Sequence, residues 1–188
     1  YGFDGWDAPD AGGDTALENF GGGHADNDTR YLNDAVAFLQ DRRDRPTGRP
    51  FCLILSLVNP HDLLSYPRSY QEGGYTDPSW LAATTPAISL PPTNGENLQL
   101  NKKPSAHQQI LNSLAIGLGP LLTDTTRQNY LNFYGNLMRK VDGQIGQFLS
   151  LTGDKNLGSK LVALGDPFLD QVDGSMEYHV VSSGGSVL

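Results

Sequence analysis

Cysteine is almost absent from this sequence, which holds only Cys52 among its 188 residues. A single cysteine excludes an intramolecular disulfide and a cysteine-rich zinc site. Because Cys52 lies inside an apolar run, we interpret it as a small buried hydrophobe and not as a reactive thiol.

Long apolar runs and clustered positive charges are also missing. The longest apolar run, residues 51–58, is far shorter than the roughly 20 residues that span a bilayer as a helix, so we expect no transmembrane segment. Lysine and arginine number 13 against 21 aspartates and glutamates, and they form no stripe along the chain. A net charge of −8 without such a stripe argues against nucleic-acid binding, which depends on clustered cations.

Two stretches have the apolar spacing of amphipathic helices. In residues 24–45, Leu32, Val36 and Leu39 recur at helical spacing, and Asp26 or Asp28 can cap the start. Residues 124–151 carry a longer apolar stripe whose members step by three or four positions. Its members are Tyr130, Tyr134, Leu137, Val141, Ile145 and Phe148.

The segment between these helices, residues 65–120, contains seven prolines. Proline removes a backbone donor and stops helices, so we predict a long irregular excursion with at most a short helix at residues 107–115.

Two apolar segments predict buried strands, residues 51–58 and 161–164. The first lacks the alternation of a half-exposed strand, which is typical of parallel strands covered by helices on both faces. Each follows a predicted helix, so the order indicates αβ units. We therefore expect an α/β fold with a mainly parallel sheet and long irregular excursions. A sheet of two strands is too small to stand alone.

Ionisable or polar residues come directly after each predicted strand, with Asn59, His61 and Asp62 after the first and Asp166 after the second. Ligands of open parallel sheets bind at the carboxyl ends of the strands. A histidine in that place can protonate a leaving group or hold an anionic oxygen near neutral pH. The alternative is an Asx-type turn made by Asn59 and Asp62, with His61 pointing to solvent.

Five segments occur in a characteristic order, and together they resemble type I sulfatases of the alkaline phosphatase superfamily. They are "YGFDGWDAPD", "GGGHADNDTRYLNDAVAFL", "GRPFCLILSLVNPHD" followed by "YPRSY", "LPPTNGENLQLNKKP" and "NYLNFYGNLMRKVDGQIGQFL". The resemblance implies that residues 1–166 are the central part of a sulfatase catalytic domain, an internal fragment of a partial α/β/α sandwich. Residues 167–188 form a divergent tail that does not resemble the family.

The same resemblance implies an activity and its cofactors. Type I sulfatases hydrolyse sulfate monoesters, here a small-molecule sulfate ester, with a divalent cation that is usually calcium (Ca2+). Their nucleophile is a formylglycine made from Cys or Ser in C/S-x-P-x-R. The family histidine maps onto His61, which would contact the sulfate and protonate the leaving alcohol.

Further site residues follow from position. Asn59 and Asp62 flank His61 and are candidates for substrate binding. Lys103 could reach a sulfate, with a solvated loop as the alternative. Asp166 lies close to the place of a metal-binding aspartate, although Pro167 replaces the His or Asn that normally follows it. The alternative for Asp166 is an ordinary turn at the end of the strand.

The departures from the family pattern also bear on function. No C/S-x-P-x-R occurs in the chain, and the paired upstream metal-binding aspartates are absent. We therefore expect no turnover by this chain alone, with the remainder of the sulfatase domain as its missing partner. The alternatives are a non-catalytic, truncated sulfatase-like module, or a phosphodiesterase or phosphonate hydrolase of the same superfamily.

Overall fold

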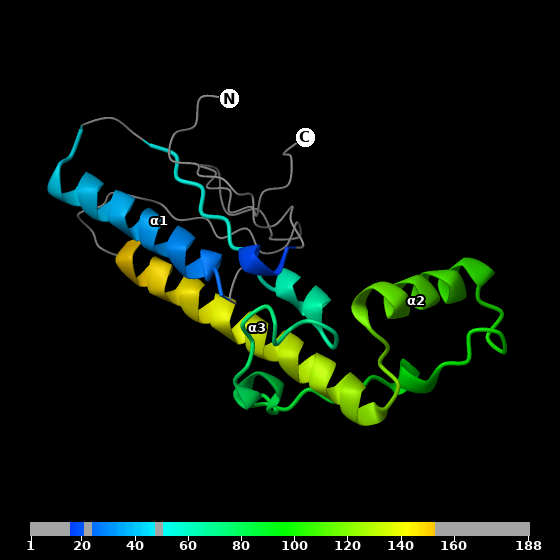
Figure 1. Cartoon of the computed structure of the whole chain (residues 1–188). Helices are drawn as coiled ribbons and strands as arrows, with labels where there is room; N and C mark the ends of the chain where they lie inside the picture. The colour runs from blue at the N-terminus through cyan, green and yellow to red at the C-terminus, as the bar shows by residue number, and fades with distance from the viewer. Residues whose placement is uncertain (1–15, 21–23, 48–50, 153–188) are drawn as a thin grey trace.

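A computed structural model describes residues 16–20, 24–47 and 51–152 (Figure 1). Its helices are α1 (Asn27–Asp44), α2 (Ser105–Leu118) and α3 (Asp124–Thr152). Short 3-10 turns punctuate the rest and are η1 (Leu17–Asn19), η2 (His61–Ser65), η3 (Pro78–Leu81) and η4 (Pro92–Gly95). The two long helices lie side by side along most of α1, with the η2 region near the middle of α3.

Helix α1 confirms the first predicted helix, with Leu32, Ala35 and Leu39 buried. Its start differs from the predicted cap. Asp26 occupies the N-cap position in a left-handed conformation (φ 42°) and makes no side-chain cap hydrogen bond. Instead, its carboxylate accepts from Lys140 Nζ of α3 at 2.7 Å, so Asp26 joins the two long helices.

Helix α3 confirms the second predicted helix. Thr123 and Thr126 cap its start reciprocally, since each side-chain oxygen accepts the backbone N–H of the other at 3.1 Å. The predicted stripe is buried in part, since Leu137, Val141 and Phe148 are buried. Tyr134 and Ile145 are 39% and 36% exposed, whereas Phe133 and Gln144 are buried.

Two apolar clusters hold the described chain together. One joins Leu32, Ala35 and Leu39 of α1 to Leu55 and to Phe148 of α3. The other gathers aromatic rings around the middle of α3, where ring centroids of Tyr75 and Phe133 lie 5.0 Å apart, edge to face. Its buried members are Phe20, Tyr66, Tyr75, Phe133 and Leu137.

Residues 51–58 do not form the predicted strand, and no strand occurs among the described residues. The segment runs without regular hydrogen bonding, with Leu55 and Val58 buried and Ile54 exposed. A strand requires a neighbouring chain to complete its hydrogen-bond ladder. The second predicted strand, residues 161–164, lies outside the described residues. The predicted parallel sheet and α/β/α sandwich are therefore not confirmed.

Cys52 is exposed, so our prediction of a buried cysteine was wrong. An apolar run is buried at every position only when both of its faces are covered. Residues 51–58 are covered on one side by α1.

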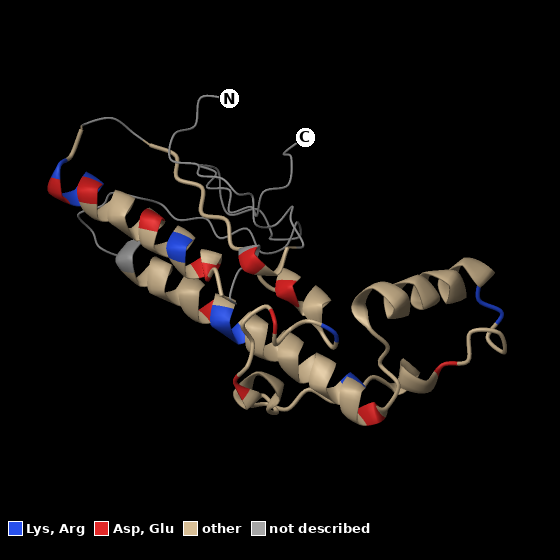
Figure 2. Cartoon of the chain, in the orientation of Figure 1, with Lys and Arg blue, Asp and Glu red and all other residues tan. Residues whose placement is uncertain are grey.

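Helix α2 extends the short helix predicted at residues 107–115. None of its residues is buried, and Ile110, Leu111, Leu114 and Ile116 are exposed. It carries no charged residue, as Figure 2 shows. Arg68 Nη1 donates to Gly117 O at its C-terminal end, 3.0 Å away. None of the described helices is long and apolar enough to cross a bilayer.

Leu137→Ala should lower the free energy of unfolding by about 2–5 kcal/mol, because it leaves a cavity at a fully buried position of α3. The matched change Leu114→Ala removes the same atoms from a side chain that is 47% exposed and should have a much smaller effect. Urea unfolding followed by circular dichroism measures both. Equal losses would mean that α2 is buried in solution.

Candidate functional site

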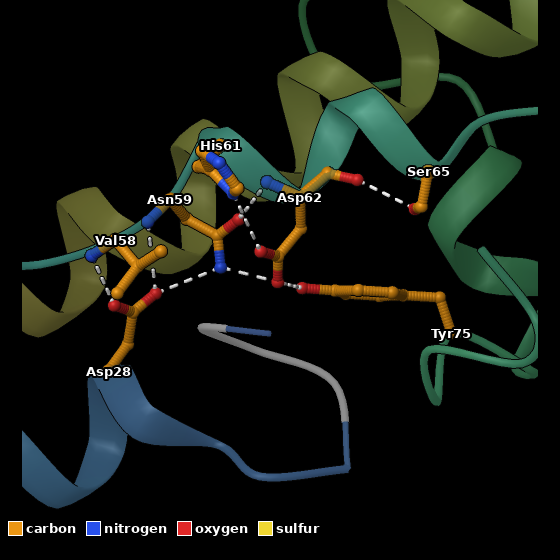
Figure 3. A network of polar contacts seen from close by, with 7 residues as sticks. All are labelled: Asp28, Val58, Asn59, His61, Asp62, Ser65 and Tyr75. Atoms are coloured by element: carbon orange, nitrogen blue, oxygen red, sulfur yellow. Dashed lines mark hydrogen bonds and ion pairs between the residues drawn. The ribbon is translucent and has the colours of Figure 1, made fainter. Parts of the chain in front are cut away.

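The turn that follows residues 51–58 carries the predicted site residues Asn59, His61 and Asp62 (Figure 3). The backbone N–H of His61 donates to Val58 O at 3.2 Å, which closes the turn. Ser65 Oγ donates to Asp62 O at 2.7 Å and closes η2 behind it. His61 and Asp62 are thus the first residues of a short, hydrogen-bonded helical turn.

Asp28, in the first turn of α1, holds the start of this turn. Its carboxylate accepts from the Val58 backbone N–H at 2.5 Å, the Asn59 backbone N–H at 3.3 Å and Asn59 Nδ2 at 2.8 Å. Burial raises the pKa of Asp28 above its ordinary value, and these hydrogen bonds act in the opposite direction. The carboxylate is fully buried, so its contacts are with protein donors.

Asn59 is buried and connects the two acidic residues of the site. Its amide nitrogen donates to Asp28 and, at 3.4 Å, to Tyr75 Oη. Its amide oxygen accepts the Asp62 backbone N–H at 3.3 Å, which is the Asx-type contact considered from the sequence. The side chain thus braces the turn from inside, and its predicted contact with substrate stays a prediction.

Asp62 is fully buried and is contacted by Tyr75 and His61. The Tyr75 hydroxyl donates to Asp62 Oδ2 in a short hydrogen bond. Burial, together with the charge of Asp62, raises the pKa of Tyr75 well above its usual range, so the phenol stays protonated and able to donate. The other oxygen, Oδ1, lies 3.7 Å from His61 Nδ1. Substrate binding by Asp62 likewise stays a prediction.

His61 lies at the edge of this network. Its side chain is 21% exposed, and its Nδ1 is buried beside Asp62 without a hydrogen-bond partner among the described residues. A partly exposed imidazole with one nitrogen facing a buried carboxylate has the composition of an acid–base group. The site therefore consists of one accessible histidine supported by a buried polar network.

The other predicted site residues lie elsewhere. Lys103 Nζ lies 3.6 Å from Glu96 Oε1, in the segment that leads into α2. Helix α2 lies apart from η2 in Figure 1. The structure therefore does not bring Lys103 to His61, and its role stays a prediction. Asp166 lies outside the described residues.

The described residues contain no cluster of acidic, histidine or cysteine side chains that could hold a metal. Within residues 16–20, 24–47 and 51–152, no three His, Cys, Asp or Glu side chains come together in a way that could hold a metal ion. Asp28 and Asp62 have their carboxylates directed at protein groups. The calcium and the formylglycine implied by the resemblance stay predictions.

Two residues of the network were missed as site residues from the sequence. Asp28 was considered only as a helix cap, and Tyr75 lies in the proline-containing excursion without any motif of its own. Asp28 did carry a signal in the sequence, because it lies four residues before Leu32, on the apolar face of α1. A carboxylate on such a face is rarely buried unless hydrogen-bond donors surround it. The sequence around Tyr75 contains no comparable signal.

Comparison with known proteins decides the family. The model of the family described as Sulfatase matches residues 3–160. This chain belongs to the sulfatase family. No curated protein and no solved structure matches it significantly. The sulfatase match spans all described residues, including the Asp28–Asn59–Asp62–Tyr75 network and His61.

Asp28→Ala should destabilise this sulfatase chain by about 1–3 kcal/mol, because two buried backbone N–H groups and the Asn59 amide lose their acceptor. Asp34→Ala makes the same change at an exposed position of α1 and should be nearly neutral. Chemical unfolding of both variants measures the difference. Equal stabilities would show that the Asp28 contacts contribute nothing to folding.

The contribution of Asp28 should also depend on pH. Its pKa is raised on folding, so its contribution to stability is largest below its ordinary pKa of 3.8 and decreases as pH rises through the folded-state value. The difference in unfolding free energy between wild type and Asp28→Ala should therefore become smaller as pH rises from 3.8 through the folded-state pKa. Unfolding at a series of pH values checks this, and a gap that widens would contradict the raised pKa.

Proposed function

We propose that this chain forms part of the catalytic domain of a sulfuric ester hydrolase, in which His61 protonates the departing alcohol of a small sulfate monoester. The observation that carries the proposal is the placement of His61. A partly exposed imidazole lies on a hydrogen-bonded turn, with one nitrogen 3.7 Å from a buried carboxylate. The sulfatase match supports the reaction class.

The chemistry assigned to this chain is on the leaving-group side. As the sulfur–oxygen bond breaks, negative charge develops on the alcohol oxygen, and a proton from the imidazolium of His61 neutralises it. The ring then holds the electron pair of the former N–H bond and regains its proton from water. The family nucleophile requires C/S-x-P-x-R, which this sequence does not contain. The nucleophile and the metal therefore belong to the remainder of the domain.

His61→Ala should slow sulfate-ester hydrolysis by an amount that depends on the leaving group. The test protein is the complete domain in which this chain is joined to its C/S-x-P-x-R segment. With an alkyl sulfate, whose alcohol needs a proton to depart, we expect kcat to fall about 10²- to 10⁴-fold. With 4-nitrophenyl sulfate, whose phenolate departs readily, we expect a much smaller loss.

Two controls accompany this experiment. His107→Ala changes an exposed histidine of α2 and should leave both substrates unaffected. If His61→Ala lowered kcat equally with both substrates, the proposal that His61 protonates the leaving group would be contradicted. Faster turnover of bis-4-nitrophenyl phosphate than of any sulfate would assign the domain to phosphodiester hydrolysis instead.

A further inference from the structure

The polar contacts between Asn59 and His61 have a defined direction. Asn59 Nδ2 donates to Tyr75 Oη, and the Tyr75 hydroxyl donates to Asp62 Oδ2. Because the phenol accepts on one side, its single hydrogen is committed to Asp62 on the other. Asp62 Oδ2 therefore accepts that hydrogen, and the other oxygen, Oδ1, faces His61 Nδ1 (Figure 3).

This arrangement gives Asp62 a different role from the one expected on sequence position. Its side chain is completely buried, and its two oxygens are directed at Tyr75 and at the imidazole. A substrate would have to displace one of these groups to reach it. Of the two groups, only the imidazole is partly exposed, so Asp62 can act on a substrate through His61.

The effect on His61 follows from the two tautomers of imidazole. A neutral ring carries its proton on one nitrogen and presents a lone pair on the other. With the lone pair on Nδ1, it would face the negative Oδ1 of Asp62, whereas an N–H there is attracted to it. The 3.7 Å separation is longer than a hydrogen bond in the free protein, and catalytic contacts of this kind tighten when substrate binds.

We propose that Asp62, held by Tyr75, is a positioning residue that fixes the proton of His61 on Nδ1 and leaves Nε2 as the atom that exchanges a proton with the leaving alcohol. The tautomer assignment rests on the contacts above, and its catalytic consequence rests on the proposed function.

The tautomer can be measured directly by NMR of the full chain with ¹⁵N-labelled histidine. The chain has four histidines, and the signals lost in His61→Gln identify those of His61. In the wild type at a pH where the ring is neutral, we expect a protonated Nδ1 and an unprotonated Nε2. A wild-type ring with its proton on Nε2 would overturn the proposal, whatever the variants do.

Asp62→Asn provides the decisive variant. Tyr75 still needs an acceptor, so it should take the amide oxygen and turn the amide NH₂ toward His61 Nδ1. Since Nδ1 must then accept, the proton should move to Nε2, and the ¹⁵N shifts of the two ring nitrogens should exchange. An unchanged tautomer in a folded Asp62→Asn chain, checked by circular dichroism, would contradict the role of Asp62.

Tyr75→Phe is the matched control, because it disturbs the same buried network but keeps the carboxyl group of Asp62. It should retain the wild-type tautomer. If Tyr75→Phe also moved the proton to Nε2, a general loosening of the turn would explain both results. The specific role of Asp62 would then be contradicted.

Activity of the complete domain separates this inference from the proposed function. We expect Asp62→Asn to lower kcat by about 10²-fold with the alkyl sulfate, to change KM little, and to affect 4-nitrophenyl sulfate less. If Asp62→Asn exchanges the tautomer but the loss in His61→Ala does not depend on the leaving group, Asp62 positions His61 and His61 is not the acid. If the loss in His61→Ala depends on the leaving group but Asp62→Asn leaves the tautomer unchanged, His61 is the acid and Asp62 does not position it.

Discussion

The buried carboxylate of Asp28 joins the first turn of α1 to Val58, which lies 30 residues further along the chain. It accepts the backbone N–H groups of Val58 and Asn59, at the end of a segment that has no strand partner among the described residues. A buried carboxylate tolerates loss of water only when several donors replace it. That requirement fixes the turn containing His61 against the first turn of α1.

The network beyond Asp28 extends the same constraint to a second buried acid. Asn59 contacts Asp28 with its amide nitrogen and the backbone of Asp62 with its amide oxygen, so the two carboxylates are placed relative to one another by one side chain. The ring of Tyr75 packs edge to face on Phe133 of α3 while its hydroxyl donates to Asp62. The core of α3 thus determines where the oxygen facing His61 lies.

The sequence predicted the helices better than the segments between them, for a physical reason. Apolar spacing in α1 and α3 is a local property, and both helices appear where the spacing placed them. The strand at residues 51–58 depends on a neighbour elsewhere in the chain, and apolar composition alone could not supply it. On α3, Phe133 is buried although it lies outside the predicted stripe, because it packs on Tyr66, Tyr75 and Trp80, contacts that no periodicity specifies.

The candidate site shows the same division. His61 was identifiable because it follows the apolar run within a family motif, and the structure places it beside Asp62, its neighbour in sequence. Asp28 and Tyr75 come from before and after that motif and meet it only through folding.

Asn59 and Asp62 look alike in sequence as polar residues next to a histidine. Burial distinguishes them from His61, since both are directed at protein groups and the imidazole alone of the three retains appreciable exposure. A motif can therefore locate a reacting side chain, whereas the groups that orient it are recognised only from the hydrogen bonds and burial that surround them.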